Sequence, residues 1–434
     1  MRISLKNSPL MLLVHGLLIW SFSAGGIADL YAQGAPPAAG RGAATTASAA
    51  SQLSVPVPLS GHSTIRDLES DTSLGASYPR VIQLKTYEPG KGQLLATYSR
   101  RGAMPIYRST DNGDTFQFFS EIKGLRGQPS LYELPVKMGE FPAGTIMAAA
   151  EQDPTDPARR TLGCYYSSDG GKTWQYLSTF AVGGPGRYDP NDRAGISLQQ
   201  NPIFEPYLYA DAAGRLVVYF SDERDKKSGY SQLLDHRVSN DGGRTWGDPV
   251  YDVAIADGLT RPGMAVVTRA GNGKFFMVYE MVGMPGHALE PRSNLVHFRV
   301  SDDGDNWGDF KQYGTLIQDR WRQFPWATPY IVWSPWPAPN GTLLVTGRAI
   351  MRYDLGQVGN GMMINRKNGE GLWTLIETPI RYTPGPGGYS QTMIPLGDGR
   401  EILQMVPVDG RIQFAKFKMP ETEKLPTYQF PWDK

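Results

Sequence analysis

An eight-residue string recurs along this chain of 434 residues and restricts the possible folds more than any other feature. It reads STDNGDTF from Ser109, SSDGGKTW from Ser167 and SNDGGRTW from Ser239, and a shortened copy, SDDGDNW, begins at Ser301. Each copy stands between two β-like runs, which is where a hairpin turn is expected. Asp accepts hydrogen bonds from the backbone of such a turn, Gly adopts positive φ, and the aromatic residue can be buried. The string therefore predicts a repeated structural turn.

An Asp-rich loop can also bind calcium, which is the competing interpretation of the repeated string. Calcium loops supply several oxygen ligands at alternate positions. Here a single Asp recurs per copy, and two of the copies contain a cation, Lys172 or Arg244. These two observations favour the structural interpretation.

A second, longer repeat indicates the number of units. Six segments combine a Gly-containing turn with a hydrophobic run, mostly after an early Pro, and start 50 to 77 residues apart. They begin at Tyr78, Gln128, Glu205, Arg261, Thr328 and Tyr389. A period in this range is typical of a propeller, and two strands per segment plus the following hairpin give four strands per unit. The sequence therefore predicts an all-β fold, a six-bladed β-propeller with four-stranded antiparallel blades.

The two ends of the chain differ in composition from the repeat region. A basic N-terminus precedes an apolar run from Leu10 to Trp20, so residues 1–32 are expected to be a secretory signal peptide. Residues 33–52 are rich in Ala, Gly and Pro and predict a linker. The propeller is expected over residues 53–419, closed by the stretch after the linker and by IQFAKFKM, with a tail over 420–434. A secreted or periplasmic protein is expected.

Charge and residue types argue against several classes of ligand. The 43 basic and 42 acidic residues give a net charge of +1, which favours neither nucleic acid nor, after signal cleavage, a membrane. The single cysteine, Cys164, excludes an internal disulfide, and the five histidines form no zinc-binding pattern. No phosphate-binding loop or serine-nucleophile string is present. We expect a monomer that needs no metal or cofactor.

Charged and aromatic residues are predicted to meet at one end of the central channel. Equivalent positions of a radial repeat are related by rotation about its axis, so the first residues of the six segments should share one end. The following strands return to that end and add Arg100, Arg101, Glu151, residues 222–224, Glu280 and Arg348. Any one of these charges could belong to a structural ion pair, but the convergence of several favours a functional site.

Paired carboxylates suit glycoside hydrolysis, because one protonates the leaving oxygen while the other attacks the anomeric carbon or activates water. Glu205 begins a strand in the third unit and Glu280 ends one in the fourth, so both can face the channel from neighbouring units. Glu151 is a third candidate.

Two family resemblances agree with these patterns. The repeated string resembles the Asp-box of the sialidase superfamily, which implies a six-bladed propeller. The segments NPIFEPYLYADAAGRLVVYFSDER, FFMVYE and FPWATPYIVWSP resemble the exo-arabinanases of glycoside hydrolase family 93, and the similarity covers most of the domain. This second resemblance implies a secreted enzyme that cleaves α-1,5-linked arabinan from a chain end with retention.

The family 93 resemblance also implies roles for individual residues. Glu205 and Glu280 would be the catalytic pair, assigned as acid/base and nucleophile respectively, although the sequence does not decide between the two assignments. Trp321 and Trp326 would stack on a second sugar ring. The substrate-binding residues would be Tyr78, Arg80, Gln128, Arg261, Arg348 and Tyr389.

A sialidase and a non-catalytic lectin remain alternatives. Sialidase chemistry would use Arg80, Arg224 and Arg348 against a carboxylate, with Tyr389 as nucleophile and Glu205 as its partner. Two departures count against it: Pro79-Arg80-Val81 replaces the usual Arg-Ile-Pro, and no Asp precedes Asp111 in the segment expected to hold the general acid. A lectin would bind sugar through aromatic residues such as Trp321, Trp326 and Tyr330, but would not need two facing glutamates.

Overall fold

Antiparallel strands make up nearly all the regular structure of this protein. The computed structural model describes residues 55–69, 75–100, 103–152, 159–184, 201–284, 294–382 and 387–422. The expected signal peptide, the linker and most of the expected tail lie outside the described residues. Two short 3-10 turns occur in the described part of the chain, at Glu88–Gly90 and Lys226–Ser228, and no helix there is long and apolar enough to cross a membrane.

The strands form six sheets. The first sheet contains β3 (Ser77–Gln83), β4 (Leu94–Ser99), β5 (Met104–Ser109) and β6 (Gln117–Ile122). The second contains β7 (Leu125–Glu133), β8 (Ile146–Gln152), β9 (Thr161–Ser167) and β10 (Gln175–Val182). The third contains β11 (Ile203–Ala210), β12 (Leu216–Asp222), β13 (Leu233–Ser239) and β14 (Val250–Ala254).

The other three sheets carry the additions to this pattern. The fourth contains β15 (Arg261–Arg269), β16 (Phe275–Val282), β17 (Asn294–Ser301) and β18 (Thr315–Leu316), and is extended by β19 (Gln323–Trp326), β22 (Ala349–Arg352) and β23 (Gly356–Gly359). The fifth contains β20 (Tyr330–Ser334), β21 (Thr342–Thr346), β24 (Met362–Asn365) and β25 (Thr374–Ile376). The sixth contains β26 (Thr392–Leu396), β27 (Glu401–Val408), β28 (Arg411–Lys418), β2 (Arg66–Glu69) and β1 (Gly61–His62).

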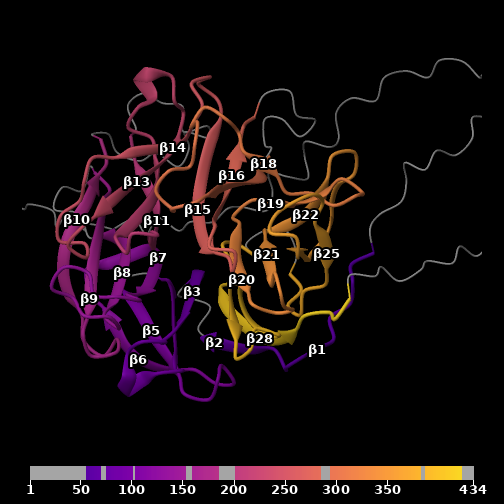
Figure 1. Ribbon diagram of the computed structural model, residues 1–434, viewed down its shortest axis with the longest axis horizontal. Helices are drawn as coiled ribbons and strands as arrows, with labels where there is room; N and C mark the ends of the chain where they lie inside the picture. Colours follow the sequence, from indigo (N-terminus) through magenta and orange to yellow (C-terminus); the bar gives the residue numbers. More distant parts are fainter. Residues whose placement is uncertain are drawn as a thin grey trace, which may run out of the picture. The chain divides into compact units, whose positions relative to one another are not determined.

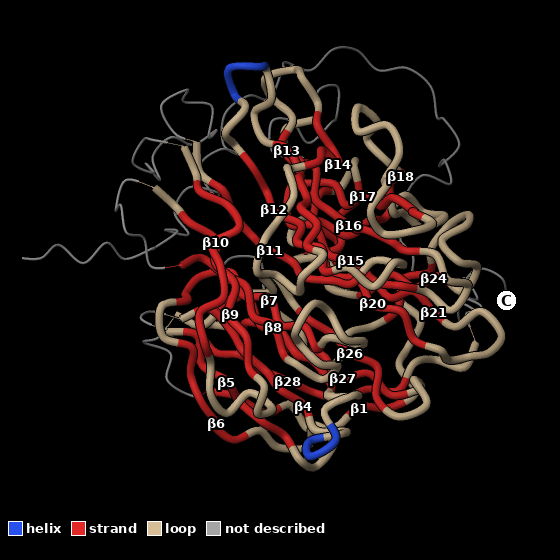
Figure 2. Tube along the Cα trace, turned by 60° about the vertical axis from the view of Figure 1, so that its left-hand side comes forward, coloured by secondary structure: helices blue, strands red, loops and turns tan. Residues whose placement is uncertain are grey.

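The first strands of the six sheets surround a common axis. Strands β3, β7, β11, β15, β20 and β26 contact one another in sequence, and β26 contacts β3 again, so the circle is closed (Figures 1 and 2). N-terminal β2 pairs with C-terminal β28, which confirms the prediction that the two ends of the domain close the ring. The protein is thus an all-β propeller with four-stranded antiparallel blades. We call the end at which the first strands begin and the second strands finish the mouth.

Apolar side chains fill the space between neighbouring sheets. One buried cluster joins Leu94 of the first sheet to Leu403 and Phe414 of the sixth, and another joins Met147 of the second sheet to Leu216 of the third. Burial of each such side chain stabilises the fold by about 1.5–3 kcal/mol. Packing between sheets therefore fixes where the strand ends at the mouth stand relative to one another.

The repeated string forms a structural turn, as the sequence predicts. All four copies lie between the third and fourth strands of their sheets, at the end opposite the mouth. In the first copy Asp111 accepts hydrogen bonds from the Thr115 backbone N–H (2.9 Å) and hydroxyl (2.6 Å), while Gly113 donates its N–H to Ser109. The second and third copies repeat these bonds. The Asp is thus occupied within the turn itself.

The aromatic residue of each string packs against the preceding sheet. The indole N–H of Trp174 donates to the hydroxyl of Ser120 in β6 (3.3 Å), and the indole N–H of Trp246 donates to the hydroxyl of Ser178 in β10 (3.0 Å). A fifth, degenerate copy, NRKNGEGLW, was missed in the sequence: Asn365 replaces Ser and accepts from the Lys367 and Gly369 N–H groups. The strings therefore join one blade to the next.

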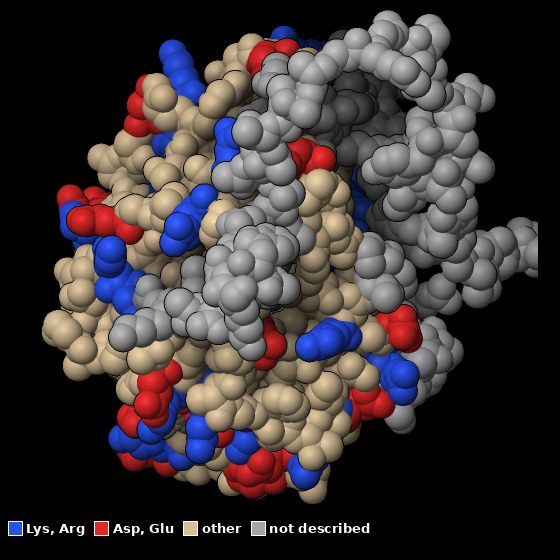
Figure 3. Space-filling view, turned by 90° about the vertical axis from the view of Figure 1, so that its right-hand side faces the viewer, with Lys and Arg blue, Asp and Glu red and all other residues tan. Residues whose placement is uncertain are grey.

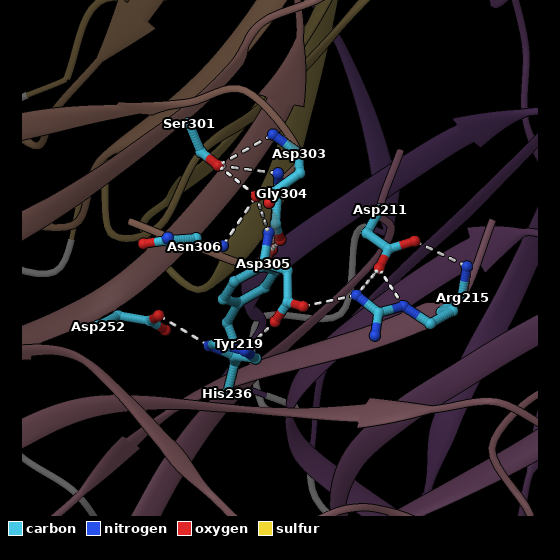
Figure 4. A network of polar contacts seen from close by, with 10 residues as sticks. All are labelled: Asp211, Arg215, Tyr219, His236, Asp252, Ser301, Asp303, Gly304, Asp305 and Asn306. Atoms are coloured by element: carbon cyan, nitrogen blue, oxygen red, sulfur yellow. Dashed lines mark hydrogen bonds and ion pairs between the residues drawn. The ribbon is translucent and has the colours of Figure 1, made fainter. Parts of the chain in front are cut away.

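A buried polar network adds another connection between the third and fourth sheets (Figure 4). His236 of β13 lies between Asp252 of β14, at 2.7 Å, and Asp305 of the turn after β17, at 2.9 Å. Burial alone would lower the pKa of His236, but the two carboxylates outweigh it and raise the pKa to about 10. Arg215 pairs with Asp305 and with Asp211 of its own sheet. All these charges have partners, so the network is structural.

Candidate active site

Four of the six first strands have a bulge just inside the mouth, whereas β20 and β26 pair with their neighbours without a register shift. The pairing of β3 with β4, β7 with β8, β11 with β12 and β15 with β16 skips residues at the same relative position. At these four bulges, and at the same position just before β20 and β26, the backbone adopts positive φ, which is strained for residues other than glycine. Tyr78, Glu205, Met264, Thr328 and Ser390 have φ of 46–59°, and Gly127 serves in the second sheet.

The bulges correct the alignment of the six segments made from sequence. Counted back from the first residue of the regular pairing, which follows the bulge in four sheets and begins β20 and β26 in the other two, the equivalent positions are Tyr78, Gln128, Glu205, Met264, Thr328 and Ser390. The predicted equivalents Arg261 and Tyr389 are wrong by three residues and one residue, because those segments have more residues before the regular pairing. Both residues still belong to the mouth.

Side chains of one blade accept the backbone N–H groups that these positions of the next blade leave free. The Glu205 N–H donates to Gln128 Oε1 (3.1 Å), and the Met264 N–H donates to Glu205 Oε2 (3.2 Å). The Thr328 N–H donates to Glu280 Oε2 (2.7 Å), and the Ser390 N–H donates to the Thr328 hydroxyl (3.1 Å). Four consecutive links therefore run in one direction around the mouth, and both predicted catalytic glutamates are part of them.

Glu205 and Glu280 are partly buried and come together on strand β15. The Glu205 carboxylate contacts the Met264 N–H, while Glu280 of β16 is the cross-strand partner of Gly263, the residue before Met264. A methyl group on Gly263 would lie 3.7 Å from Glu205 Oε2. Gly263 thus lies within ordinary contact distance of Glu205 and pairs with the residue that carries the second carboxylate.

The two carboxylates differ in their hydrogen bonds. Glu205 accepts from the Ser221 hydroxyl (2.8 Å), the Tyr78 hydroxyl (3.2 Å) and the Met264 N–H, and these bonds oppose the rise in its pKa that burial causes. Within the part of the chain that the structure describes, Glu280 accepts one hydrogen bond, from the Thr328 N–H. Burial and the charge of Glu205 raise the pKa of Glu280 to about 7. Burial thus raises the pKa of both carboxyl groups, and hydrogen bonds stabilise the charged form of Glu205 more than that of Glu280.

Two tyrosines cover the glutamates. The hydroxyls of Tyr78 and Tyr389 lie 3.3 Å apart, and their rings pack edge to face with centroids 5.1 Å apart. Burial raises the pKa of both phenols, and nearby glutamates add to the rise. Both tyrosines are thus neutral hydrogen-bonding groups in the free protein.

Two of the predicted arginines lie beside these tyrosines. Arg80 is buried, donates to the Ser390 carbonyl (3.3 Å) and hydroxyl (3.0 Å), and lies over the ring of Tyr330. Arg348 follows β21, lies 5.3 Å from the ring centroid of Tyr389, and carries a positive charge that opposes the rise in the pKa of Glu280. Arg80 therefore belongs to the floor of the mouth and Arg348 to its wall.

The third predicted arginine, Arg261, is held by Glu223, which the sequence placed at the mouth without a role, and by Gln232, which sequence reasoning missed. It forms an ion pair with Glu223 (2.5 Å) and donates to Gln232 Oε1 (2.7 Å). Glu223 also pairs with Lys226 at 2.6 Å. The only signal in the sequence was the place of Glu223, just after the end of β12 at the mouth; Gln232, directly before β13, gave none.

Other predicted residues are less central. Arg224 pairs with Asp222 and Asp235, which offset its charge. Glu151 occupies the position equivalent to Glu280 in the second sheet but is paired with Arg126 and Arg160.

The two predicted stacking tryptophans occupy different places. Trp326 ends β19, two residues before Thr328 at the start of the fifth sheet, whereas Trp321 stands in the turn that precedes β19, 4.9 Å from Arg320. In the described part of the chain no group of three or more His, Cys, Asp or Glu side chains could hold a metal ion. The chemistry that the mouth offers is therefore that of a carboxylate and a carboxylic acid side by side, with arginines and phenols to orient hydroxyl groups.

Surface charge gives no competing site on the face shown in Figure 3. Basic and acidic side chains are interspersed there. Such a surface creates no extended field of one sign.

Comparison with known proteins identifies the family. Neither a scan against protein-family models nor a search of curated proteins found a match. Among solved structures, the α-L-arabinanase of Penicillium chrysogenum complexed with arabinobiose is 31% identical, with a TM-score of 0.70 over 82% of this chain and 98% of that one. The GH93 α-L-arabinofuranosidase of Fusarium graminearum with arabinobiose is 26% identical, with a TM-score of 0.68 over 80% and 93%.

A more distant structure shows the fold alone. A Hadza microbial sialidase is 14% identical with a TM-score of 0.51, over 79% of this chain and 65% of that one. Together with the Penicillium and Fusarium structures, this likeness confirms the two resemblances noted in the sequence: the chain belongs to glycoside hydrolase family 93, on a sialidase-like β-propeller.

Proposed function

We propose that this protein is a secreted, exo-acting hydrolase of α-1,5-linked arabinan that uses Glu205 and Glu280 with retention of configuration. The observation that carries the proposal is the meeting of both glutamates on β15, through the Met264 N–H and through Gly263, in a chain similar to arabinanases. We also count each of the six sheets as one blade, since their first strands close a circle. The carboxyl groups should then lie about 5 to 5.5 Å apart, as retention requires.

The environments of the two carboxylates assign their roles. A retaining hydrolase begins with one ionised carboxylate and one protonated acid. Three hydrogen bonds stabilise the charge of Glu205, whereas Glu280 has a pKa of about 7. Glu205 is therefore the nucleophile and Glu280 the acid/base, the reverse of the assignment made from sequence.

The reaction then has two balanced steps. In the first, Glu205 forms a bond to the anomeric carbon while the glycosidic bond breaks, and the leaving oxygen takes the proton of Glu280. In the second, ionised Glu280 removes a proton from water, the resulting oxygen attacks the same carbon, and Glu205 leaves as a carboxylate. Arg261, Arg348, Tyr78 and Tyr389 would orient sugar hydroxyls.

Release of reducing sugar from linear arabinan tests the proposal. Glu205→Gln and Glu280→Gln should each lower kcat/KM at least about a thousandfold, whereas Glu151→Gln, at the equivalent position of the second sheet, should retain activity. Azide should restore turnover of an activated arabinoside by Glu280→Ala with a retained azide product, and by Glu205→Ala with an inverted one. The opposite pattern would restore the assignment made from sequence.

Two further assays address the mode of attack and the alternative substrate. Exo attack predicts one short product from the start of the reaction, with little early loss of arabinan viscosity. Sialyl-lactose should not be cleaved. Release of sialic acid that is lost in Tyr389→Phe but kept in Glu280→Gln would replace the two-glutamate mechanism by tyrosine chemistry.

A further inference from the structure

A charged cluster beside the mouth connects a loop of the third sheet to the glutamate pair. Glu223 follows β12 and is almost fully buried, with 2% of its surface exposed. Its two carboxylate oxygens contact two cations, Lys226 at 2.6 Å and Arg261 at 2.5 Å. Lys226 is also buried, with 6% exposed. The cluster therefore holds two positive charges and one negative charge in a place with little water.

The cluster is connected to the glutamates through the backbone of β15. Gln232 accepts from Arg261 and donates to the Pro262 carbonyl at 2.8 Å. A methyl group on Gly263 would lie 2.6 Å from Gln232 Nε2 and 3.7 Å from Glu205 Oε2, so Gln232 and Glu205 face the same glycine. The position of the Arg261 side chain is thus fixed by Glu223, Gln232 and the strand that carries the bulge.

Arg261 is one of several groups that act on Glu280. The others are Glu205 from β11, Arg348 after β21, and the neutral phenols of Tyr78 and Tyr389. Of the two cations, Arg348 is held mainly by the Gly387 carbonyl and the face of Tyr389, whereas Arg261 is held by a carboxylate that a second cation neutralises. The charge near Glu280 can therefore be changed through Glu223 and Lys226 without a change in the mouth itself.

We propose that Glu223 and Lys226 are positioning residues that hold Arg261 and set the net positive charge acting on Glu205 and Glu280. Glu223 offsets part of the charge of Arg261, and Lys226 offsets part of the charge of Glu223. This inference rests on the proposed function, in which the two glutamates are catalytic. It assigns to this loop control of the pH range over which the enzyme works.

Two substitutions of opposite charge test the proposal. Glu223→Gln keeps an oxygen that can accept from Arg261 but removes a negative charge, so ionised Glu280 is favoured. The alkaline limb of kcat/KM for linear arabinan should move to lower pH by about half a unit to one unit. Lys226→Met removes a positive charge and should move the limb to higher pH. The double variant should return the limb close to the wild-type position.

Controls separate this role from a structural one. Glu140→Gln breaks an exposed ion pair with Arg244 at the end opposite the mouth and should not move the limb. If Glu223→Gln and Lys226→Met lower kcat or the Tm while the limb stays in place, or if both move it in the same direction, the proposal is overturned.

A readout without substrate separates failure of this inference from failure of the proposed function. The Tm of each variant is compared with and without Glu280→Gln as a function of pH. The pH at which the Tm begins to fall below that of the same protein with Glu280→Gln should be lower in Glu223→Gln and higher in Lys226→Met, even if no variant cleaves arabinan. No movement in this series would refute the inference by itself.

Discussion

Replacement of Glu280 by glutamine should change how stability depends on pH. The amide oxygen can still accept the Thr328 N–H, so the main loss is the titratable proton. The pKa of Glu280 is raised from 4.5 to about 7, and each unit corresponds to about 1.36 kcal/mol, which gives about 3 kcal/mol in total. Because the folded state binds this proton more tightly than the unfolded chain, its contribution is full below about pH 4.5 and is lost as the pH rises through about 7.

Wild type should therefore lose stability relative to Glu280→Gln between pH 4.5 and pH 8. For a domain of this size, about 3 kcal/mol corresponds to a Tm difference of about 4 °C. Scanning calorimetry of both proteins in half-unit pH steps measures it. A Tm difference that stays constant with pH, or that favours wild type at pH 8, would refute the reasoning.

Glu151 supplies the control for this measurement. It occupies the equivalent position in the second sheet, but its carboxylate is paired with Arg126 and Arg160. Glu151→Gln should lower the Tm at neutral pH rather than raise it, because it removes the partner of two cations.

Three further predictions concern other parts of the fold. His236→Gln should lower the free energy of unfolding by about 3 kcal/mol or more at pH 7. Because the pKa of His236 is raised, its contribution to stability is largest at low pH, so the variant should also lack the fall in Tm that wild type shows as the pH rises from 6.5 through about 10. Gly263→Ala should lower kcat/KM about tenfold with little change in Tm, because the added methyl group meets Gln232 at 2.6 Å; unchanged kinetics would show that Gln232 moves away freely. Removal of residues 1–69, which include β2, should lower the Tm by at least about 5 °C, whereas removal of residues 1–52 should not; calorimetry of both truncations distinguishes ring closure from a dispensable N-terminus.

The blades were predictable from sequence because their signals are local. Each repeated string places Ser, Asp, Gly and an aromatic residue within eight positions, and the bonds they form stay inside one turn. The fifth copy was missed because Asn365 replaces Ser while making the same bonds to the backbone. The hairpin of β22 and β23, which with β19 extends the fourth sheet, was not predicted, since it has no counterpart in the other repeats.

The bulges and the support of the site were not predictable. Positive φ is usually marked by glycine, but Tyr78, Glu205 and Met264 adopt it because contacts between blades require it. For this reason Arg261 and Tyr389 were placed at the wrong equivalent positions. Glu223 and Lys226 carry no motif, and only the fold brings them to Arg261.

The links between blades have a consequence for how such enzymes lose activity in evolution. Glu205 and Glu280 each hold a backbone N–H of the neighbouring blade, so their replacement by alanine removes an acceptor as well as a carboxylate. Gln128 and Thr328 already accept such a backbone N–H without serving as catalytic residues. A descendant that no longer cleaves sugar should therefore retain glutamine, asparagine, serine or threonine at the two catalytic positions. Its ancestry would be visible as an inert propeller that keeps all four links from the second sheet to the sixth.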